Sequence, residues 1–376
     1  GGGYNFVNPE IEITYEIKAE KNTNHSNGVS TLDLVLVQRH ILGLQELDSP
    51  YKVIAGDVNG SEKLTSADLL ELRKLILGIK TEFSNNQSWR FVDAAQTFND
   101  ITDPFPFNEE IMILNYNNEN LSGNNFVGVK IGDVNNSAAV DNFNGDNTST
   151  TRSNNALSLN VDNVTYKAGD LVSIPVTADN FTDMVGFQFT LEAAGMELVD
   201  VKAGALNITN DNVAAFNKDE AMTISWNTST EFSTDENEVL FTVIMRANTN
   251  NELSDAIDIT STITNAEAYT SSLEVDGVEI NVRGEYTNVA VQFELFQNTP
   301  NPFDGFTTIP FNLPETGNVT LNVFDITGKV IYNTIGEYTK GVNRITLDNA
   351  NMNAKGIMYY QLEYNGIVAT KKMISL

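Results

Sequence analysis

The feature that most constrains this chain is a repeated unit, in which a polar loop precedes an amphipathic helix. One copy runs from Asn22 to Leu44 and the other from Asp57 to Ile79, an offset of 35 residues. The second copy has apolar residues three and four apart, which places them on one helix face: Leu69, Leu72 and Ile76. Each helix pattern ends at a glycine, Gly43 or Gly78. Residues 1–140 therefore contain two short helices held by loops.

The loops carry the oxygen ligands that calcium prefers. A twelve-residue calcium loop supplies ligands from positions 1, 3, 5, 7, 9 and 12. In the second copy these are Asp57, Asn59, Ser61, the carbonyl of Lys63, Thr65 and Asp68. In the first copy they are Asn22, Asn24, Ser26, the carbonyl of Gly28, Ser30 and Asp33. Because the first loop offers a single carboxylate, we expect it to bind calcium more weakly.

This loop–helix repeat resembles the type I dockerin, a duplicated calcium-binding module. A third segment, Gly132–Ser137, repeats the start of the loop without a following helix, and Asp133 and Asn135 are its candidate ligands. The alternative is that these segments are ordinary Asx turns that cap helices. The resemblance implies calcium as the cofactor. We expect the intervening residues 80–131 to be irregular and to pack the two helices together.

Composition excludes several classes of protein. The chain has no cysteine, so disulfides and thiolate chemistry are impossible, and its two histidines, His25 and His40, fit structural roles. The net charge of −28 opposes binding to nucleic acid. Residues 1–140, 141–285 and 286–376 carry −9, −18 and −1, so the acidity is concentrated in the middle. No apolar run reaches the length of a transmembrane helix. The start at Gly1, without a methionine or signal peptide, suggests a processed product or fragment.

The apolar period changes to two after a polar stretch. We expect a linker at 141–155 and a β-sandwich of antiparallel sheets at 156–285. The segments LVSIPV (171–176) and MVGFQFTL (184–191), followed by ISW and VLFTVIM, resemble cohesin-like and carbohydrate-binding sandwiches. In those families a VxIPV…GFQF strand pair builds one sheet. The resemblance argues fold more than function.

Cohesins bind dockerins, and both resemblances occur in this one chain. The modules could pair, within a chain or between chains as a scaffold, or each could serve as a spacer. We favour the spacer interpretation. Glycan binding is a further hypothesis. It has no support from a sugar-binding platform, because the sequence shows no exposed aromatic cluster.

Residues 293–376 resemble the type A C-terminal sorting domain of the Bacteroidetes type IX secretion system. The matching residues are Asn301, Pro302, Phe303, Gly328, Gly341, Gly356, Lys371, Lys372 and Met373. Alternation at 319–324, a turn at 325–329 and the Asn365-Gly366 hairpin signal predict an antiparallel sandwich of about seven strands. The alternative for Asn301–Phe303 is a domain-entry turn with a buried phenylalanine, and both interpretations could hold together.

The resemblance implies export across the outer membrane to the cell surface or medium. In the family, the outer-membrane translocon and its shuttle protein read this domain, and a sortase-like peptidase often removes it. Family cargoes include gliding-motility adhesins and degradative enzymes. We therefore expect a mainly β, multidomain, non-catalytic C-terminal portion of a large surface or secreted protein, with calcium-stabilised spacer or adhesin modules. A glycoside hydrolase is the enzymatic rival, but the acidic residues are scattered over turns, and no serine–histidine–aspartate order or HExxH motif is present.

Overall fold

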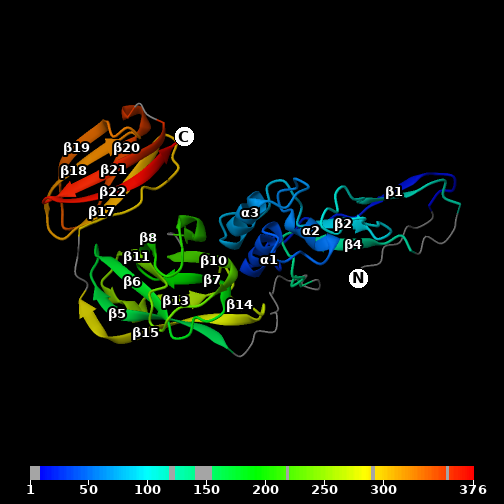
Figure 1. Ribbon diagram of the computed structural model, residues 1–376, viewed down its shortest axis with the longest axis horizontal. Helices are drawn as coiled ribbons and strands as arrows, with labels where there is room; N and C mark the ends of the chain where they lie inside the picture. Colours follow the sequence, from blue (N-terminus) through cyan, green and yellow to red (C-terminus); the bar gives the residue numbers. More distant parts are fainter. Residues whose placement is uncertain (1–8, 118–122, 140–154, 217–219, 289–292, 353–354) are drawn as a thin grey trace.

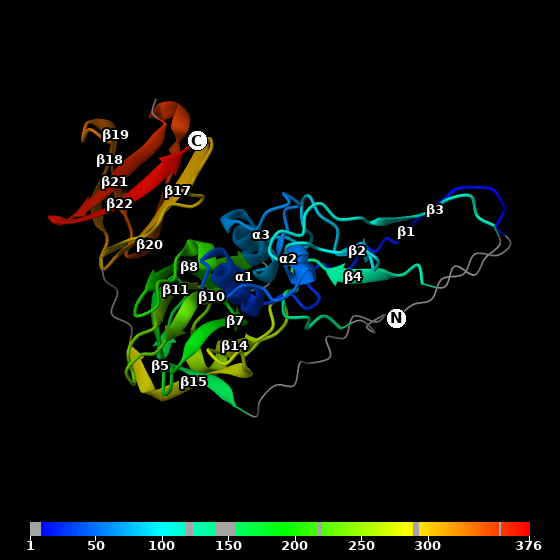
Figure 2. The same cartoon turned by 45° about the vertical axis from the view of Figure 1, so that its right-hand side comes forward.

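The protein folds into three modules along the chain. A computed structural model describes residues 9–117, 123–139, 155–216, 220–288, 293–352 and 355–376. Figure 1 shows a helical N-terminal module, a central β-sandwich and a smaller C-terminal β-sandwich. Figure 2 shows that the N-terminal module also extends a long two-stranded arm, made of β1 (Tyr15–Lys18) and β3 (Glu110–Ile113), away from the other two. The predicted mainly β, multidomain fold is confirmed. The predicted linker lies outside the described residues, except for Asn155.

Two helices of the N-terminal module start where the repeated pattern predicts them. α1 spans Thr31–Ile41 and α3 spans Ser66–Ile76. At the start of each, an aspartate in the first turn accepts a hydrogen bond from the N–H of the residue before the helix: Ser30 to Asp33 and Thr65 to Asp68, both at 2.8 Å. This is the capping-box arrangement, which satisfies backbone donors that have no partner inside the helix.

The helix ends also follow the sequence. Gly43 and Gly78 come just after α1 and α3, with φ of 66° and 72°. Glycine adopts this left-handed conformation without a steric penalty, so it ends a helix readily. The third helix, α2 (Pro50–Gly56), has only seven residues and a proline in its first turn, and the sequence pattern did not predict it.

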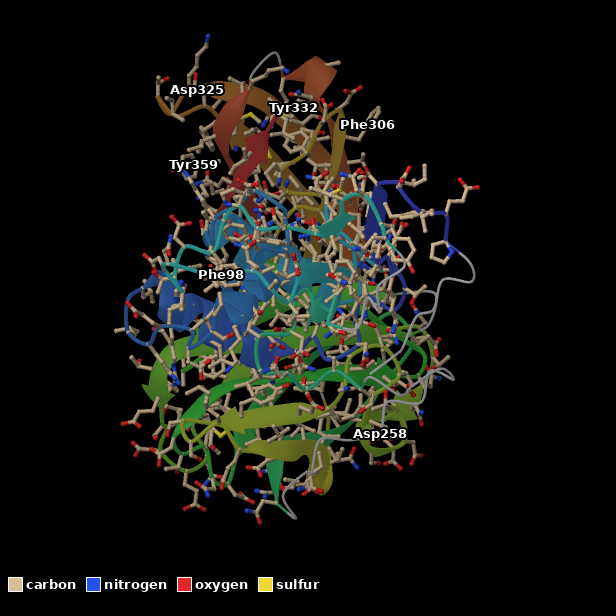
Figure 3. All side chains as sticks on the ribbon, turned by 90° about the vertical axis from the view of Figure 1, so that its right-hand side faces the viewer. Phe98, Asp258, Phe306, Asp325, Tyr332 and Tyr359 are labelled. Atoms are coloured by element: carbon tan, nitrogen blue, oxygen red, sulfur yellow. The ribbon has the colours of Figure 1, made fainter. Side chains whose placement is uncertain are left out.

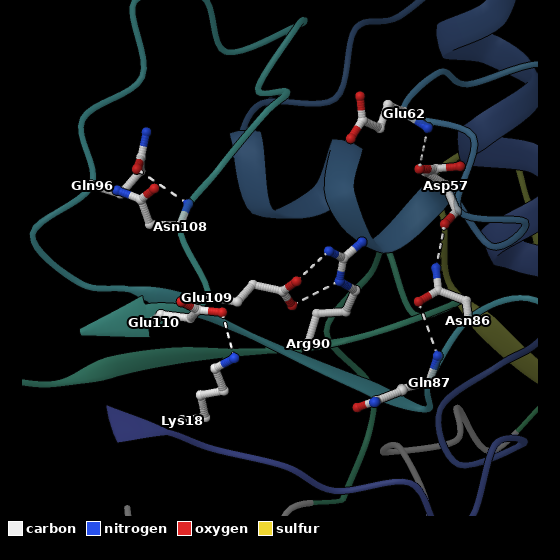
Figure 4. A network of polar contacts seen from close by, with 10 residues as sticks. All are labelled: Lys18, Asp57, Glu62, Asn86, Gln87, Arg90, Gln96, Asn108, Glu109 and Glu110. Atoms are coloured by element: carbon white, nitrogen blue, oxygen red, sulfur yellow. Dashed lines mark hydrogen bonds and ion pairs between the residues drawn. The ribbon is translucent and has the colours of Figure 1, made fainter. Parts of the chain in front are cut away.

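The rest of the N-terminal module is more regular than predicted. β2 (Trp89–Asp93) pairs antiparallel with β4 (Phe126–Lys130), and β1 (Tyr15–Lys18) pairs antiparallel with β3 (Glu110–Ile113). The prediction of an irregular segment at 80–131 is therefore wrong for β2, β3 and β4, which lie within it. They are only four or five residues long, too short to give a clear alternation. Figure 4 shows the polar contacts that flank them, which include the ion pairs Lys18–Glu110 and Arg90–Glu109.

Within the described residues, the central module is a sandwich of eleven strands. These are β5 (Ala156–Tyr166), β6 (Leu171–Ala178), β7 (Met184–Ala193), β8 (Met196–Ala203), β9 (Val213–Phe216), β10 (Ala221–Phe232), β11 (Phe241–Ala247), β12 (Asn251–Glu252), β13 (Ile257–Thr260), β14 (Glu267–Thr270) and β15 (Val275–Asn288). They are hydrogen-bonded in the order β8-β11-β6-β5-β15-β14-β7-β10-β9, with β12 beside β5 and β13 beside β7. All pairs are antiparallel except β5 with β15. The sandwich prediction is confirmed, and the parallel pair is an addition to it.

One predicted strand pair of the sandwich is wrong. β6 pairs with β5 and β11, whereas β7 pairs with β10, β13 and β14, so the two segments are not neighbours in one sheet. The residues between them include Phe181, which is buried and packs against the rings of Phe187 and Trp226. The buried Phe181 thus fixes the connection between β6 and β7, which passes from one layer of the sandwich to the other.

The C-terminal module is a second, smaller sandwich, as predicted. Its strands are β16 (Glu294–Leu295), β17 (Phe306–Leu313), β18 (Gly317–Phe324), β19 (Val330–Tyr338), β20 (Gly341–Asp348), β21 (Gly356–Tyr364) and β22 (Ile367–Ser375). They form the sheets β16-β17-β20 and β19-β18-β21-β22. Tyr364 pairs with Ile367 across Asn365 and Gly366, whose φ values of 50° and 78° are those of the predicted two-residue hairpin. Figure 3 shows this module above the other two, with Tyr332 and Tyr359 labelled on it.

Candidate functional site

The N-terminal module lies directly against the central sandwich. Figures 1 and 2 both show α1 and α3 beside β7, β10 and β14. Leu32 and Val35 of α1 form a buried apolar cluster with Val185 of β7 and Tyr269 of β14. The four side chains are at most 5% exposed, and they are distinct from the cores of the two modules. The modules therefore share an apolar interface of their own.

Polar contacts fix the first turn of α1 on the sandwich. The backbone N–H of Thr31 donates to Oε1 of Gln188 at 2.6 Å, and its hydroxyl lies 2.7 Å from that of Ser225. A helix leaves its first N–H groups without an internal acceptor, so Gln188 satisfies a donor that would otherwise be buried unpaired. Gly186 permits the close approach, because a Cβ there would lie 3.0 Å from Cγ2 of Thr31.

Asn227 of β10 links both helices to the sandwich. Its Nδ2 donates to Oε1 of Gln38 at 2.7 Å, and its Oδ1 accepts from a guanidinium nitrogen of Arg73 at 2.5 Å. Nearby, Nε of Arg39 donates to the carbonyl of Ser229 at 2.9 Å. Burial lowers the pKa of Arg73, and the carboxylate of Asp211 opposes this change. The helices thus present two arginines to the most acidic module of the chain.

The C-terminal end of α3 is capped by the sandwich. The hydroxyl of Thr264 donates to the carbonyl of Ile76 at 2.5 Å, and that of Thr223 donates to the carbonyl of Leu77 at 2.7 Å. The last carbonyls of a helix have no internal donor, so two threonines of the other module supply it. Both hydroxyls are buried. The interface therefore uses the start of one helix and the end of the other.

The second loop gathers its predicted carboxylates. Asp57, 1% exposed, accepts from the N–H groups of Ser61 at 2.9 Å and Glu62 at 2.8 Å. Asp68, fully buried, accepts from the N–H groups of Asn59 at 3.2 Å and Thr65 at 2.8 Å. Figure 4 shows Asp57 between Glu62 and Asn86. Burial raises the pKa of Asp68, and Asp57 adds to this effect.

The donor set of the second loop fits a hard cation. Oδ1 of Asn59 is buried and has no hydrogen-bond partner within the described residues, and the hydroxyl of Ser61 lies 3.2 Å from the Lys63 carbonyl. No group of three or more His, Asp or Glu side chains that could hold a metal exists in the described part of the chain. The loop instead combines two carboxylates with amide, hydroxyl and carbonyl oxygens. This mixture is typical of calcium sites.

The predicted first loop is not gathered in the same way. Oδ1 of Asn22 accepts from the N–H of Ser88 at 2.8 Å, and the carbonyls of Asn24 and Ser26 close local turns. Asp33, from the same predicted loop, instead accepts from the N–H of Val134 at 2.8 Å. The structure thus brings Asp33 to the Gly132–Ser137 segment. The spacing of a contiguous loop does not predict this arrangement. The repeated sequence at 132–137 is the feature that indicates it.

Both histidines make structural contacts. Nδ1 of His25 accepts from the N–H of Phe83 at 3.3 Å, and Nδ1 of His40 accepts from the N–H of Leu47 at 3.1 Å. Burial lowers the pKa of both imidazoles.

The predicted sorting residues occupy both the surface and the core of the C-terminal module. Phe303 is buried, its N–H donates to the carbonyl of Ile374, and Oδ1 of Asn301 accepts from the Ile374 N–H at 2.8 Å. Pro302 is exposed between them. The segment is therefore an entry turn with a buried phenylalanine, fastened to the last strand.

The remaining predicted sorting residues serve turns and strands. Gly328, Gly341 and Gly356 have φ of 83°, 91° and 90°, which favours glycine. Of the three residues near the end, Met373 is buried in the core, Lys372 is exposed, and Lys371 contacts the central sandwich.

The C-terminal module also rests on the central sandwich. Nζ of Lys371 lies 3.5 Å from Asp200, and Glu197 lies 3.1 Å from Arg344. Phe296 packs with two apolar side chains of the sandwich in a small buried cluster. Burial raises the pKa of Asp200, and Lys371 opposes the rise. The nearly neutral module thus meets the acidic one through two of its own basic side chains, and through one ion pair of the opposite sense, between Lys202 of the sandwich and its own Glu294.

Three family models match the chain, each over one module. Residues 23–77 match the dockerin type I domain, 157–282 the cohesin domain, and 299–375 the secretion system C-terminal sorting domain. None of the curated proteins matches the chain. Among the described residues, no helix is long and apolar enough to cross a membrane.

Solved structures similar to the chain are cohesins and cohesin complexes. A type I cohesin–dockerin complex (Coh-OlpA–Doc918) from Clostridium thermocellum is 17% identical, with 36% of this chain and 100% of that chain covered and a TM-score of 0.26. A non-cellulosomal cohesin from Archaeoglobus fulgidus is 19% identical, with 36% and 91% covered and a TM-score of 0.27. The seventh ScaB type I cohesin from Pseudobacteroides cellulosolvens is 15% identical, with 36% and 94% covered and a TM-score of 0.26.

The family matches follow the order of the three modules. The sorting domain marks its carriers for type IX secretion to the cell surface or the extracellular space. The chain therefore carries, in this order, a dockerin type I domain, a cohesin domain and a type IX secretion sorting domain, and it is an exported protein.

Proposed function

We propose that this protein is a non-catalytic surface or secreted unit in which the dockerin region docks onto the cohesin domain of the same chain. The observation that carries the proposal is the seating of α1 and α3 on β7, β10 and β14. The contacts there join residues 146 to 194 positions apart in sequence. They satisfy polar backbone groups at the start of α1 and at the end of α3. Docking makes one stiff unit of two modules, suited to a spacer or an adhesin stalk.

Calcium completes this unit. The second loop, with Asp57, Asn59, Ser61, the Lys63 carbonyl, Thr65 and Asp68, holds an ion between two buried carboxylates whose mutual repulsion it offsets. The bound ion supplies charge and rigidity, not chemistry. None of the three matched domains is catalytic, and both histidines are engaged in structural contacts.

The C-terminal module acts as the export address. The outer-membrane translocon and its shuttle protein recognise it, and a sortase-like peptidase removes it afterwards. Grafting residues 293–376 onto a fluorescent reporter in a type IX-competent host tests this role. Export of the reporter is expected, and retention of the reporter in the periplasm contradicts it.

Energy transfer between two dyes tests docking within one chain. The protein has no cysteine, so Leu42→Cys and Glu231→Cys, both at exposed positions near the Arg39–Ser229 contact, accept dyes specifically. We expect high transfer in the doubly labelled chain at any concentration, and none between singly labelled chains. Transfer only between separate chains would establish the scaffolding alternative, which the presence of both partner domains in one chain also permits. Absence of energy transfer both in the doubly labelled chain and between singly labelled chains would contradict docking altogether.

A further inference from the structure

The last described residues of the N-terminal module repeat the start of the second calcium loop. Residues 132–137 read GDVNNS, and residues 56–61 read GDVNGS. Val58 and Val134 are both buried, at 1% and 0% exposure. Gly60 and Asn136, at matching positions, both adopt the left-handed conformation, with φ of 70° and 61°. The two segments therefore share a backbone shape as well as a sequence.

The first aspartate of each segment is held in the same way. In the second loop, the two carboxylate oxygens of Asp57 accept from the N–H groups four and five residues later, at 2.9 and 2.8 Å. In the other segment, the two oxygens of Asp133 accept from the N–H groups of Ser137 and Ala138, four and five residues later, both at 2.9 Å. Asp133 thus stands where a calcium loop has its first ligand.

The second half of this loop comes from the other end of the module. The hydroxyl of Ser61 donates to the carbonyl of Lys63, two residues later, at 3.2 Å. The hydroxyl of Ser137 donates at 3.0 Å to the carbonyl of Gly28, which is 109 residues away in sequence. The second loop is therefore continuous in sequence from Asp57 to Asp68. In the other loop, the ligand positions after Ser137 are supplied by a separate segment that begins at Gly28.

The closing aspartates also correspond. One oxygen of Asp68 accepts from Asn59 N–H at 3.2 Å and the other from Thr65 N–H at 2.8 Å. One oxygen of Asp33 accepts from the N–H groups of Val134 at 2.8 Å and Asn135 at 3.3 Å, and the other from Ser30 N–H at 2.8 Å. The six ligand positions of the second loop therefore each have a residue of the same chemical kind in a loop made of two separate segments. The amide position differs in one contact: Oδ1 of Asn135 accepts from the N–H of Ser137 at 3.0 Å, whereas Oδ1 of Asn59 has no partner within the described residues.

We propose that the first calcium site of this protein is split between the two ends of its dockerin module. Its ligands are Asp133, Asn135 and Ser137 from one end, and the Gly28 carbonyl, Ser30 and Asp33 from the other. Asn22, Asn24 and Ser26, the ligands expected of a contiguous loop, take no part. The proposal rests on calcium binding by the module, as proposed above, and reassigns one of the two sites.

The chemistry of the split loop suits the ion. It brings together two carboxylates, an amide, two hydroxyls and a carbonyl, all of them the hard oxygens that calcium selects. Asp33 is fully buried and Asp133 is 4% exposed. The nearest buried cation, Lys130, directs its ammonium to the carbonyls of His25 and Ile131 at 2.7 and 2.8 Å, and not to either carboxylate. The ammonium still interacts electrostatically with both carboxylates, but it supplies one positive charge against two negative ones, and a calcium ion balances the remainder.

The split site links calcium to docking. Asp33 belongs to the first turn of α1, two residues after the Thr31 that bonds to Gln188 and Ser225 of the cohesin domain. Residues 132–138 are the part of the dockerin module nearest in sequence to the cohesin domain, whose first strand begins at Ala156. One ion therefore joins both ends of the dockerin module and holds the helix turn that enters the interface.

Calorimetric titration of the calcium-free full chain with calcium chloride tests the split site. The wild type is expected to bind two ions. Asp133→Ala should lose one and keep the other, whereas Asp57→Ala should lose the complementary one. Asn22→Ala is the matched control from the contiguous loop, and it should keep both.

Hydrogen exchange of the wild type supplies a second measurement that does not depend on variants. Peptides covering 28–34 and 132–138 should gain protection together, at one calcium concentration. Two ions retained in Asp133→Ala, an ion lost in Asn22→Ala, or separate protection of the two peptides would each overturn the split site. If the wild type binds one ion, which Asp57→Ala abolishes, the split site alone fails. If the wild type binds none, the calcium part of the proposed function fails with it.

Discussion

Truncating one side chain of the docking interface gives the sharpest test of its energetics. Leu32 lies on α1, is 5% exposed, and packs against Val185 and Tyr269 of the cohesin domain. It is not part of the dockerin core. Leu32→Ala should therefore weaken docking while leaving the fold of each module intact.

The size of the effect follows from the burial of this leucine. Buried leucine-to-alanine changes cost about 2.7–5.0 kcal/mol in a protein core, from lost transfer free energy and the remaining cavity. At an interface between modules, water or a small shift can fill part of the cavity, so we expect about 2–3 kcal/mol. Because 1.4 kcal/mol is a factor of ten, the docking equilibrium constant should fall by about 30- to 150-fold.

Hydrogen exchange of the Thr31 amide measures this change. As the first residue of α1, Thr31 has no acceptor inside the helix, so its protection comes from Oε1 of Gln188 at 2.6 Å. Its protection factor should drop by the same 30- to 150-fold ratio, because exchange then reports the undocked fraction.

A matched substitution on the other helix provides the control. Leu70→Ala makes the same change on α3, at a side chain that is 48% exposed, and it should alter the Thr31 protection by less than about twofold. Equal effects of the two substitutions would refute the reasoning. So would a Leu32→Ala variant whose dockerin module unfolds as a whole, because the leucine would then belong to that core.

Three further predictions concern single side chains. Tyr360→Phe removes a buried hydroxyl that donates to the Phe296 carbonyl at 2.7 Å, so the C-terminal module should lose about 1–3 kcal/mol in denaturant unfolding; an unchanged midpoint contradicts this. The ammonium of Lys80 lowers the pKa of Glu71, so Lys80→Met should raise that pKa in an NMR titration. The stability that this pair contributes should be lost as the pH falls through the lowered pKa of Glu71. An unchanged pKa of Glu71 in the variant would contradict this prediction. Gly132→Ala places a methyl group 2.9 Å from two side chains at φ of 89° and should lower the melting temperature of the N-terminal module.

The sequence sufficed where the determining interactions are local. The starts of α1 and α3 follow from Asp33 and Asp68, which bond to N–H groups three residues away, and such contacts are encoded in a short window. The hairpin at Asn365 and Gly366 follows from the left-handed conformation that both residues accept. These features were predictable because each depends on fewer than about six consecutive residues.

The sequence did not suffice where distant segments meet. A twelve-residue template counts positions along the chain, so it assigned Asn22 to the first loop, whereas contacts in space bring Asp133 to Asp33. The sequence did not predict docking either. The contact of Thr31 with Gln188 joins two surfaces that lie far apart in the sequence, and neither carries a sequence pattern that indicates a partner. The placement of β6 and β7 depends on Phe181, whose burial in the core is a property of the whole sandwich.

The docked helices also determine how the protein carries mechanical force. Residues 140–154 join the dockerin and cohesin modules once along the chain, and the contacts of α1 and α3 join them a second time. A pull between the arm of β1 and β3 and the sorting domain is then borne by the interface in parallel with that segment. When the interface ruptures, the modules can separate by up to roughly 50 Å, the contour length of those residues, without either module unfolding. We therefore expect the interface to act as a reversible extension element, which lengthens under load and recovers when the load is removed.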